Sequence, residues 1–363
     1  MGESSITIQG ASGRPSRVSF GPLSGLGEEI ESAKTVIVTD PEIQRLHGDE
    51  LPSCPIALVE PGEAAKSLSS LEKLYARFLE LELGRDGTVL AVGGGTVSDL
   101  AGFAASTWLR GVDFGFAPTT LLAMVDASVG GKNGVDYRGV KNLIGSFSQP
   151  RFVRIDVSLL GSLPDREFAS GMGEVVKHAV ISGGSYFELV QASAPKQAGC
   201  REATHRLDQA TLERIVRGSV EIKASVVSED EREGGRRRVL NLGHSAGHGI
   251  EVATGIPHGH AIAAGLGTAC RLAVSLGRLG QDDCDLITRL IEAWGLPHTI
   301  AAAAGTGSVP DSPELRKAVA KAIASDKKRQ GGDILMALPE AIGKVIIEAV
   351  PLSDLQAFVM EAP

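Results

Sequence analysis

The chain has 363 residues, more than the roughly 250–300 at which one hydrophobic core stops growing, so we expect two domains with a ligand-binding cleft. Its net charge of −8 argues against a general nucleic-acid binder, which needs an excess of Lys and Arg on one face. The four Cys residues form no CxxC pair, which favours a reducing compartment. Residues 1–20 lack a signal-peptide pattern and no apolar run reaches about 18 residues, so we expect a cytoplasmic protein that does not enter a membrane.

The first half of the chain alternates short β-branched runs with helical stretches. Strands are predicted at 35–40 and 88–92, with a helix at 68–83 between them. The last strand is predicted at 152–156. This order is typical of βαβ units, so we expect an α/β domain built on a mainly parallel sheet.

The second half changes character near 162–167. Amphipathic segments such as 211–227 and 261–276 are separated by turns that contain Gly and Pro. We therefore expect a mainly helical second domain, with the boundary after residue 163.

A glycine turn follows the strand at 88–92. Gly93, Gly94 and Gly95 lead into a helical segment, where backbone N–H groups can approach a pyrophosphate. The pattern is neither G-x-G-x-x-G nor a Walker A loop, and a tight strand-to-helix turn explains it equally well. Asp40 at the end of the first strand, where a ribose could bind, and the polar loop at 62–66 complete the outline of a dinucleotide site.

Histidines are clustered in the second half. His244 and His248 are four residues apart, which on a helix places both rings on one face. A zinc protease would have Glu where this chain has Ser245. His258 is a further imidazole, and Glu174 lies in an otherwise apolar segment earlier in the chain. Together, two imidazoles and one carboxylate could form a metal site with an open coordination position. Any one of these His residues alone is more often a core or surface histidine, so the prediction depends on the combination.

Two further groups of residues suit anions. Asp126 and Lys132 bracket a glycine-containing segment, and Lys141 and Asn142 follow another turn. This composition is typical of loops that bind small anions, but it is also typical of solvated loops. The basic clusters at 236–238 and 326–329 are typical of a solvated face, although one cation from each could point inward.

Taken in order, these segments resemble the 3-dehydroquinate synthase family of sugar phosphate cyclases. The resemblance covers most of the chain, and several motifs in one order are more specific than any one of them. The matching segments are Gly62–Lys66, Gly93–Gly102, Trp108–Val112, Pro118–Asp126, Gly130–Lys132, Lys141–Gly145, Leu163–Phe168, Glu174–Lys177, Ile222–Lys223, Leu240–His244, His258–Gly259, Asp326–Lys328 and Leu338–Pro339.

The resemblance implies a Rossmann-like, parallel-sheet NAD-binding domain over 1–163 and a mainly helical metal- and substrate-binding domain over 164–363. It implies that NAD oxidises a ring hydroxyl, phosphate leaves, the hydride returns, and ring opening and an aldol step give 3-dehydroquinate. It also implies a homodimer and no net redox change.

The same resemblance implies roles for single residues. Glu174, His244 and His258 would hold Zn²⁺ or Co²⁺. Asp126, Lys177 and Asn241 would orient hydroxyls, Lys223 and Arg237 would pair with the substrate carboxylate, and His248 is the best candidate for a proton relay. The phosphate would be held by Lys132, Asn142, His248 and Lys327, with Arg110 from a second subunit. The positions that match the NAD site are Asp40, Glu63, Lys66, Gly94, Gly95, Asp99, Thr119, Thr120, Leu122, Lys141, Ser162 and Leu163.

Three departures from the family put the exact substrate in question. The chain has His260 where the family usually has Glu, Ser245-Ala246 for Thr-Phe, and Asn133 for Thr. The alternatives are a sister cyclase of the amino-dehydroquinate, deoxy-inosose or valiolone type, a metal-dependent alcohol dehydrogenase, and a non-catalytic descendant. Lys223 and Arg237 favour a substrate with a carboxylate, because two cations facing a neutral sugar would be desolvated without compensation.

Overall fold

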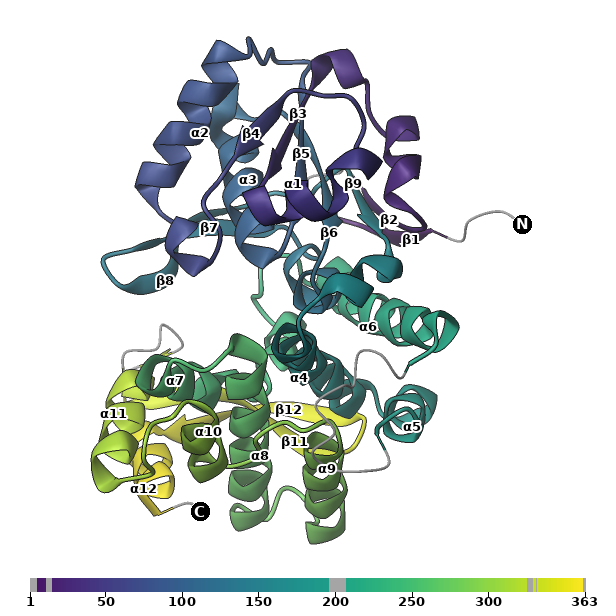
Figure 1. Cartoon of the computed structure of the whole chain (residues 1–363). Coiled ribbons are helices and arrows are strands. Elements are labelled where there is room, and N and C mark those ends of the chain that lie inside the picture. Colours follow the sequence, from purple (N-terminus) through teal and green to yellow (C-terminus); the bar gives the residue numbers. More distant parts are fainter. Residues whose placement is uncertain (1–4, 11–14, 196–206, 325–328, 331, 362–363) are drawn as a thin grey trace. The chain divides into compact units, whose positions relative to one another are not determined.

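The structure is a computed structural model of the whole chain, and it describes residues 5–10, 15–195, 207–324, 329–330 and 332–361. It divides into two compact units (Figure 1). Unit 1 contains residues 1–163 and 223–232, and unit 2 contains residues 164–222 and 233–363. None of the helices formed by these described residues has the length and apolar character needed to cross a bilayer.

Unit 1 is built on a seven-stranded sheet in the order β1-β2-β9-β6-β5-β3-β4. All neighbouring pairs are parallel except β1 with β2. Every residue of β3 and β5 is buried, as expected for parallel strands covered on both faces. The strands are β1 (Ile6–Ile8), β2 (Ser16–Phe20), β3 (Thr35–Thr39), β4 (Ile56–Leu58), β5 (Thr88–Gly93), β6 (Asp113–Pro118) and β9 (Phe152–Ile155).

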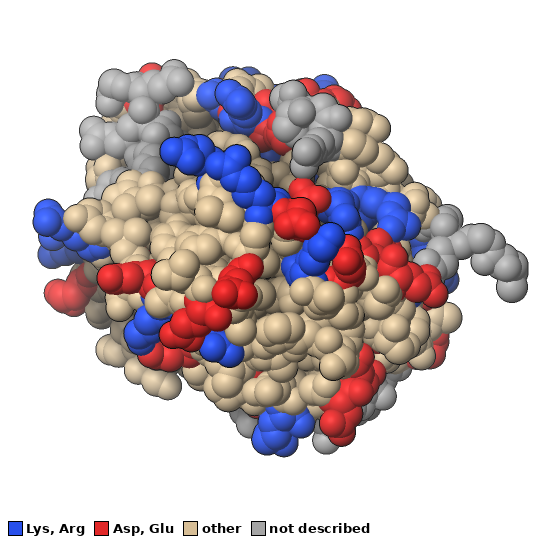
Figure 2. Space-filling view, turned by 90° about the horizontal axis from the view of Figure 1, so that it is seen from above, with Lys and Arg blue, Asp and Glu red and all other residues tan. Residues whose placement is uncertain are grey.

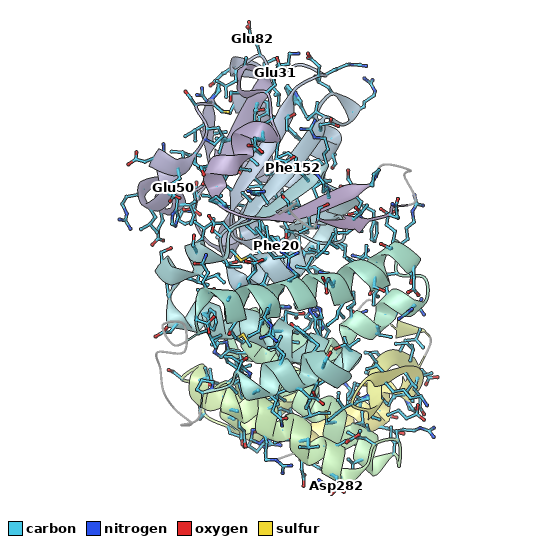
Figure 3. The ribbon with its side chains drawn as sticks, turned by 90° about the vertical axis from the view of Figure 1, so that its right-hand side faces the viewer. Phe20, Glu31, Glu50, Glu82, Phe152 and Asp282 are labelled. Atoms are coloured by element: carbon cyan, nitrogen blue, oxygen red, sulfur yellow. The ribbon has the colours of Figure 1, made fainter. Side chains whose placement is uncertain are left out.

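The Phe152 ring explains a glycine in the neighbouring strand. Gly115 of β6 pairs with Phe152 of β9, and an added Cβ at Gly115 would fall on the Phe152 ring. Figure 3 shows Phe152 among the strands of unit 1. Glycine is therefore required where this ring fills the core.

Helices and one hairpin complete unit 1. The helix α3 (Gly95–Thr107) packs on β5 and β6, which places its N-terminus at the carboxyl ends of the strands. The helices α1 (Pro41–His47) and α2 (Leu68–Glu80) follow β3 and β4 in the chain. The antiparallel hairpin of β7 (Lys132–Tyr137) and β8 (Val140–Phe147) was not predicted, because its many glycines and charges suggested loops.

Figure 2 shows a face of the molecule on which Lys and Arg are interspersed among Asp and Glu.

Unit 2 is mostly helical, as predicted, but residues 152–156 are not the last strand of the chain. A small antiparallel sheet follows near the C-terminus, with β11 (Asp333–Ala341) between β10 (Arg329–Gln330) and β12 (Lys344–Pro351). Gly343, with φ +88°, makes the tight turn between β11 and β12. The helices are α4 (Asp165–Ser182), α5 (Gly184–Ala192), α6 (Gln209–Glu229, whose end belongs to unit 1), α7 (His244–Thr254), α8 (His258–Ser275), α9 (Gln281–Ala293), α10 (Ile300–Thr306), α11 (Pro313–Ala324) and α12 (Leu352–Glu361).

Candidate functional site

Three helices of unit 2 bring one carboxylate and two imidazoles together. Glu174 is fully buried in the middle of α4, His244 is the first residue of α7, and His258 is the first residue of α8. The Oε1 atom of Glu174 lies 3.7 Å from Nε2 of His244 and 3.6 Å from Nε2 of His258. One donor atom from each residue therefore lies within 4.8 Å of the others.

Glycines next to these residues allow the helices to approach so closely. An added Cβ at Gly173 would lie against the backbone of Gly259, and one at Gly259 would overlap the carbonyl of Ser170. An added Cβ at Gly243 would lie 2.8 Å from the carbonyl oxygen of Ile262, where α7 begins beside α8. Each of the three donor residues is thus a chain neighbour of a glycine at a close helix contact, so backbone packing determines where the donors meet.

Hydrogen bonds orient both imidazoles. Nδ1 of His244 lies 3.2 Å from the carbonyl oxygen of Leu242, and Nδ1 of His258 lies 3.1 Å from Oε2 of Glu251. When Nδ1–H donates in each case, Nε2 is the ring nitrogen that faces Glu174, and it can bind a metal ion once it carries no proton. Burial lowers the pKa of His258, but hydrogen bonds to Glu174 and Glu251 outweigh it and raise the pKa to about 10. A cation that binds here displaces that proton.

The donor set fits Zn²⁺ or Co²⁺. Two donors at about 2.0–2.1 Å from a tetrahedral ion lie about 3.3 Å apart, close to the 3.6 and 3.7 Å measured here. Two neutral imidazoles and one carboxylate are ligands that zinc accepts, and three protein ligands leave one position open for a substrate oxygen. The carbonyl of Leu242 and the carboxylate of Glu251 supply the outer hydrogen bonds that such histidines usually have.

Other residues predicted for the substrate lie in unit 2 near these donors. Lys177 donates from Nζ to Oε2 of Glu174, and both side chains are buried. The ring of His248 lies 5.2 Å from that of His244 and 6.0 Å from that of His258, one helical turn along α7. Four of the predicted substrate residues are therefore in unit 2, and Lys327 lies outside the described residues.

A short 3₁₀ helix at Arg236–Asn241 carries two more of the predicted substrate residues, Arg237 and Asn241. Arg237 is 2% exposed whereas Arg236 is exposed, so one cation of this basic cluster does point inward. Asn241 donates from Nδ2 to Oε1 of Glu233, a residue in the left-handed region with φ +60°. The same short helix thus carries a buried guanidinium and an amide fixed by a carboxylate.

In unit 1 the glycine turn leads directly into α3. Gly94 is the N-cap residue of α3 and Gly95 its first residue, and no side chain caps this terminus. The first-turn N–H groups of a helix have no partner within the helix, so this end of α3 offers donors to an anion. An added Cβ at Gly94 would lie 3.2 Å from Cγ2 of Thr120. Another residue would fit at position 94 only if the side chain of Thr120 shifted slightly.

Charged side chains surround the start of α3. Nζ of Lys66 lies 2.7 Å from Oδ2 of Asp99 and 3.9 Å from Oε1 of Glu63, and Lys141 lies 3.5 Å from the same oxygen of Glu63. Burial lowers the pKa of Lys66, but the charges of Asp99 and Glu63 outweigh it and raise the pKa. Burial raises the pKa of Asp99, and the charge of Lys66 opposes this effect. The structure thus brings four of the predicted NAD positions together.

The other NAD positions have structural partners of their own. Oδ1 of Asp40 accepts from two N–H groups at the start of α1, so it caps this helix. The N–H of Thr119 donates to the carbonyl of Gly93, and Oγ1 of Thr120 accepts from the N–H of Ala123. Oγ of Ser162 donates to the carbonyl of Leu159 at 2.9 Å. Leu122 and Leu163 are half-buried and would contribute apolar contact only.

Unit 1 also holds a second set of substrate candidates. Nζ of Lys223, on the part of α6 that belongs to unit 1, donates to the carbonyl oxygen of Asp126 at 2.6 Å and to its carboxylate. Lys132 and Asn142 lie on β7 and β8 and not in loops. Arg110 is exposed beside β6 in the left-handed region, with φ +73°.

Sequence reasoning did not single out two carboxylates that take part in these contacts. Glu251 lies seven residues after His244, on the same face of α7, so helical spacing was an available signal. Glu233 lies in a run of charged residues that is typical of a solvated turn, and no sequence signal separated it from its neighbours.

Comparisons with known proteins point to one family. The family model for the N-terminal part of 3-dehydroquinate synthase matches residues 56–170, and the model for the C-terminal part matches residues 171–329. A 3-dehydroquinate synthase of Rippkaea orientalis is 40% identical over 355 residues, which cover 94% of this chain and 93% of the relative.

Solved structures of similar proteins include two sugar cyclases. A 2-deoxy-scyllo-inosose synthase with carbaglucose-6-phosphate, NAD⁺ and Co²⁺ has a TM-score of 0.84 and 26% identity, over 99% of this chain and 100% of that one. A 2-epi-5-epi-valiolone synthase of Streptomyces hygroscopicus with NAD⁺ and Zn²⁺ has a TM-score of 0.81 and 25% identity, over 94% and 95% of the two chains. The similarity extends over nearly the whole length in every case, and the chain belongs to the 3-dehydroquinate synthase family.

Proposed function

We propose that the chain is a 3-dehydroquinate synthase, a carbon–oxygen lyase of the shikimate pathway that acts in the cytoplasm. It converts 3-deoxy-D-arabino-heptulosonate 7-phosphate to 3-dehydroquinate and phosphate. The observation that carries the proposal is the meeting of Glu174, His244 and His258 from three helices, in a chain 40% identical to a 3-dehydroquinate synthase over nearly its full length.

The two cofactors are assigned to separate parts of the chain. NAD binds in residues 1–163, with its pyrophosphate at the start of α3, and Zn²⁺ or Co²⁺ binds in residues 164–363. Structures of two related cyclases with NAD⁺ and one of these metals support the assignment. When bound, NAD accepts and returns a hydride at one ring carbon, and the metal ion acidifies the hydroxyl at that carbon.

The residues around the metal ligands orient the ring. Lys177 is held by Glu174, so its remaining donors have a defined direction toward a hydroxyl oxygen. Asn241 is held by Glu233 and presents its amide carbonyl as an acceptor. In unit 1, Lys223 fixes the carboxylate of Asp126, a third group for hydroxyls. Such preset donors and acceptors lower the cost of ordering the substrate.

Cations hold the two anionic ends of the substrate. Arg237 and Lys223 pair with the carboxylate, for which the guanidinium fork gives two parallel hydrogen bonds. Lys132, Asn142, His248 and Lys327 hold the phosphate. Elimination needs a proton acceptor next to the leaving group, and His248 is suited to relay that proton because it is exposed on α7 beside the ring of His244.

The sister cyclases are the principal alternative, because two of them share the fold. A substrate without a carboxylate would leave the buried guanidinium of Arg237 without a matching charge on the substrate side, at a cost in desolvation. An alcohol dehydrogenase would release NADH and has no use for these cations. Both alternatives therefore predict different products from those of the proposed enzyme.

We also propose a homodimer in which Arg110 reaches the phosphate bound to the partner subunit. Leu109 and Arg110 both have positive φ, at 49° and 73°, a conformation that costs energy for residues other than Gly. Leu109 is 39% exposed, and β8 exposes Val140, Leu143 and Phe147 at 43%, 44% and 50%. A second copy that covers these apolar side chains would account for their exposure.

The test is an incubation of the purified protein with 3-deoxy-D-arabino-heptulosonate 7-phosphate, NAD and zinc. We expect stoichiometric phosphate release and 3-dehydroquinate, without accumulation of NADH. Glu174→Gln should abolish turnover, and glucose 6-phosphate, which has no carboxylate, should release no phosphate. Net NADH formation would support a dehydrogenase, and turnover of glucose 6-phosphate would support a sister cyclase.

A further inference from the structure

The amide of Asn133 joins the two ends of the β7–β8 hairpin. Asn133 is the second residue of β7 and is 6% exposed. Its Nδ2 donates to the carbonyl of Gly131 at 3.2 Å, before β7, and to the carbonyl of Ser148 at 2.9 Å, after β8. The N–H of Ser148 donates to the same carbonyl of Gly131 at 2.8 Å. One side chain thus uses both of its N–H donors to close the open end of the hairpin.

The helix α3 provides the space for this amide. An added Cβ at Gly102 would lie 2.2 Å from Oδ1 of Asn133 and 3.0 Å from the Phe116 ring. Only glycine at position 102 therefore accommodates the amide in this orientation. The open end of the β7–β8 hairpin therefore packs on α3, the helix whose N-terminus is the proposed pyrophosphate site.

Lys132 follows a backbone segment that needs this restraint. Gly130 and Gly131 have φ of 111° and 67°, conformations that glycine adopts at little cost and leaves easily. Successive side chains of a strand point to opposite faces, so burial of Asn133 directs Lys132 to the other, exposed face. The position of the Lys132 ammonium therefore depends on the hydrogen bonds of Asn133.

We propose that Asn133 is a positioning residue that holds Lys132 in register for the phosphate of the substrate; this rests on the proposed function. A threonine at this position would have one hydroxyl donor and would leave one of the two carbonyls without this bond. The two bonds of Asn133 therefore make the phosphate end of the site more rigid and leave the chemistry of the reaction unchanged.

The test compares Asn133→Thr with Asn133→Val, which have similar shapes but one donor and none. We expect the KM for the substrate to rise about 10-fold in the Val variant and about 3-fold in the Thr variant, with kcat and the Kd for NAD within about 2-fold of the wild type. The Ki of inorganic phosphate as a competitive inhibitor should rise in the same order. If Val does not fold, Asn133→Ser and Asn133→Ala supply the same comparison.

Ser146→Ala is the matched control. Ser146 pairs with Asn133 in the register of the hairpin, and its Oγ lies 2.8 Å from Oγ of Ser106 on α3, so the change loosens the same packing without touching either carbonyl. It should leave the substrate KM unchanged. Equal effects of the Val and Ser146→Ala variants, or equal losses of NAD and substrate affinity, would overturn the positioning role.

Hydrogen exchange gives a readout that does not depend on the reaction. The Ser148 amide should exchange slowly in the wild type and at least about 10-fold faster in Asn133→Val, because the hairpin end opens more often. If the wild type is inactive but this difference is found, the proposed function is wrong and the role of Asn133 in closing the hairpin still holds. If the exchange rate is unchanged, Asn133 does not restrain the hairpin end and the positioning role is wrong.

Discussion

The substitution Gly259→Ala should separate the proposed metal ligands without altering any of them. An added Cβ at Gly259 would lie 1.7 Å from the carbonyl oxygen of Ser170, whereas real Cβ atoms essentially never come closer than 3.0 Å. The obstacle is backbone, so a rotamer change cannot relieve it. The start of α8 must therefore move from α4 by about 1.3 Å, the difference between these two distances.

The shift bears directly on the ion. A movement of this size would carry Nε2 of His258 from 3.6 Å to about 5 Å from Oε1 of Glu174. Donors of one tetrahedral zinc ion lie about 3.3 Å apart, so the ion would lose one ligand. We expect zinc affinity to fall by about 100-fold or more, and overpacking to cost about 1–3 kcal/mol of stability.

Competition with a chromogenic chelator measures the zinc affinity, and thermal melts with and without chelator show that the protein folds. Gly305→Ala is the control, because Gly305 is in α10 of the same unit and its added Cβ would meet no atom within 4 Å apart from its chain neighbours and the backbone of its own helix. It should leave zinc affinity unchanged and stabilise α10 by about 0.5–1 kcal/mol. A Gly259→Ala protein that binds zinc within about 3-fold of the wild type would refute the reasoning.

Three other substitutions test separate contacts. Glu251→Gln should weaken zinc binding by about 10–100-fold in the same chelator competition, because His258 loses the carboxylate that orients it; unchanged affinity would count against that role. Lys66→Met should destabilise the protein by about 3 kcal/mol in urea titrations by leaving the carboxylate of Asp99 without its ion-pair partner, and adding Asp99→Asn should restore part of the loss. Arg237→Ala should raise the substrate Kd by about 10-fold or more in calorimetry while the NAD Kd stays within about 2-fold; equal losses would argue against a role with the carboxylate.

Sequence reasoning predicted what depends on local chemistry. The parallel sheet followed from β-branched runs and the spacing between them, and the pairing of His244 with His248 on one face followed from their four-residue separation. The association of Glu174 with His258 could not come from spacing, since 84 positions of chain separate them. It came from the chemistry of the combined donors and from the family resemblance, and the structure supplies the physical reason in the close contacts of Gly173 and Gly259.

Other features could not be predicted from the sequence, because they depend on packing between residues far apart in the chain. Glycines at 130, 131, 134, 139 and 145 suggested loops, but Gly134 and Gly145 face each other where an added Cβ would strike the opposite strand, so glycine here permits a tight hairpin. The sheet of β11 and β12 was overlooked because unit 2 reads as helical in most of its length. The basic run at 236–238 alone gave no indication which side chain is buried; the family resemblance pointed to Arg237, and in the structure this side chain is buried.

The most direct test of the central claim follows the hydride. The substrate carries deuterium on the ring carbon whose hydroxyl is oxidised, and the reaction runs with zinc, NAD⁺ and a small pool of unlabelled free NADH. The account predicts that 3-dehydroquinate keeps the deuterium at that carbon while the NADH pool stays unlabelled, because one bound NAD takes and returns the same hydride. Deuterium in free NADH, or its loss from the product, would contradict it.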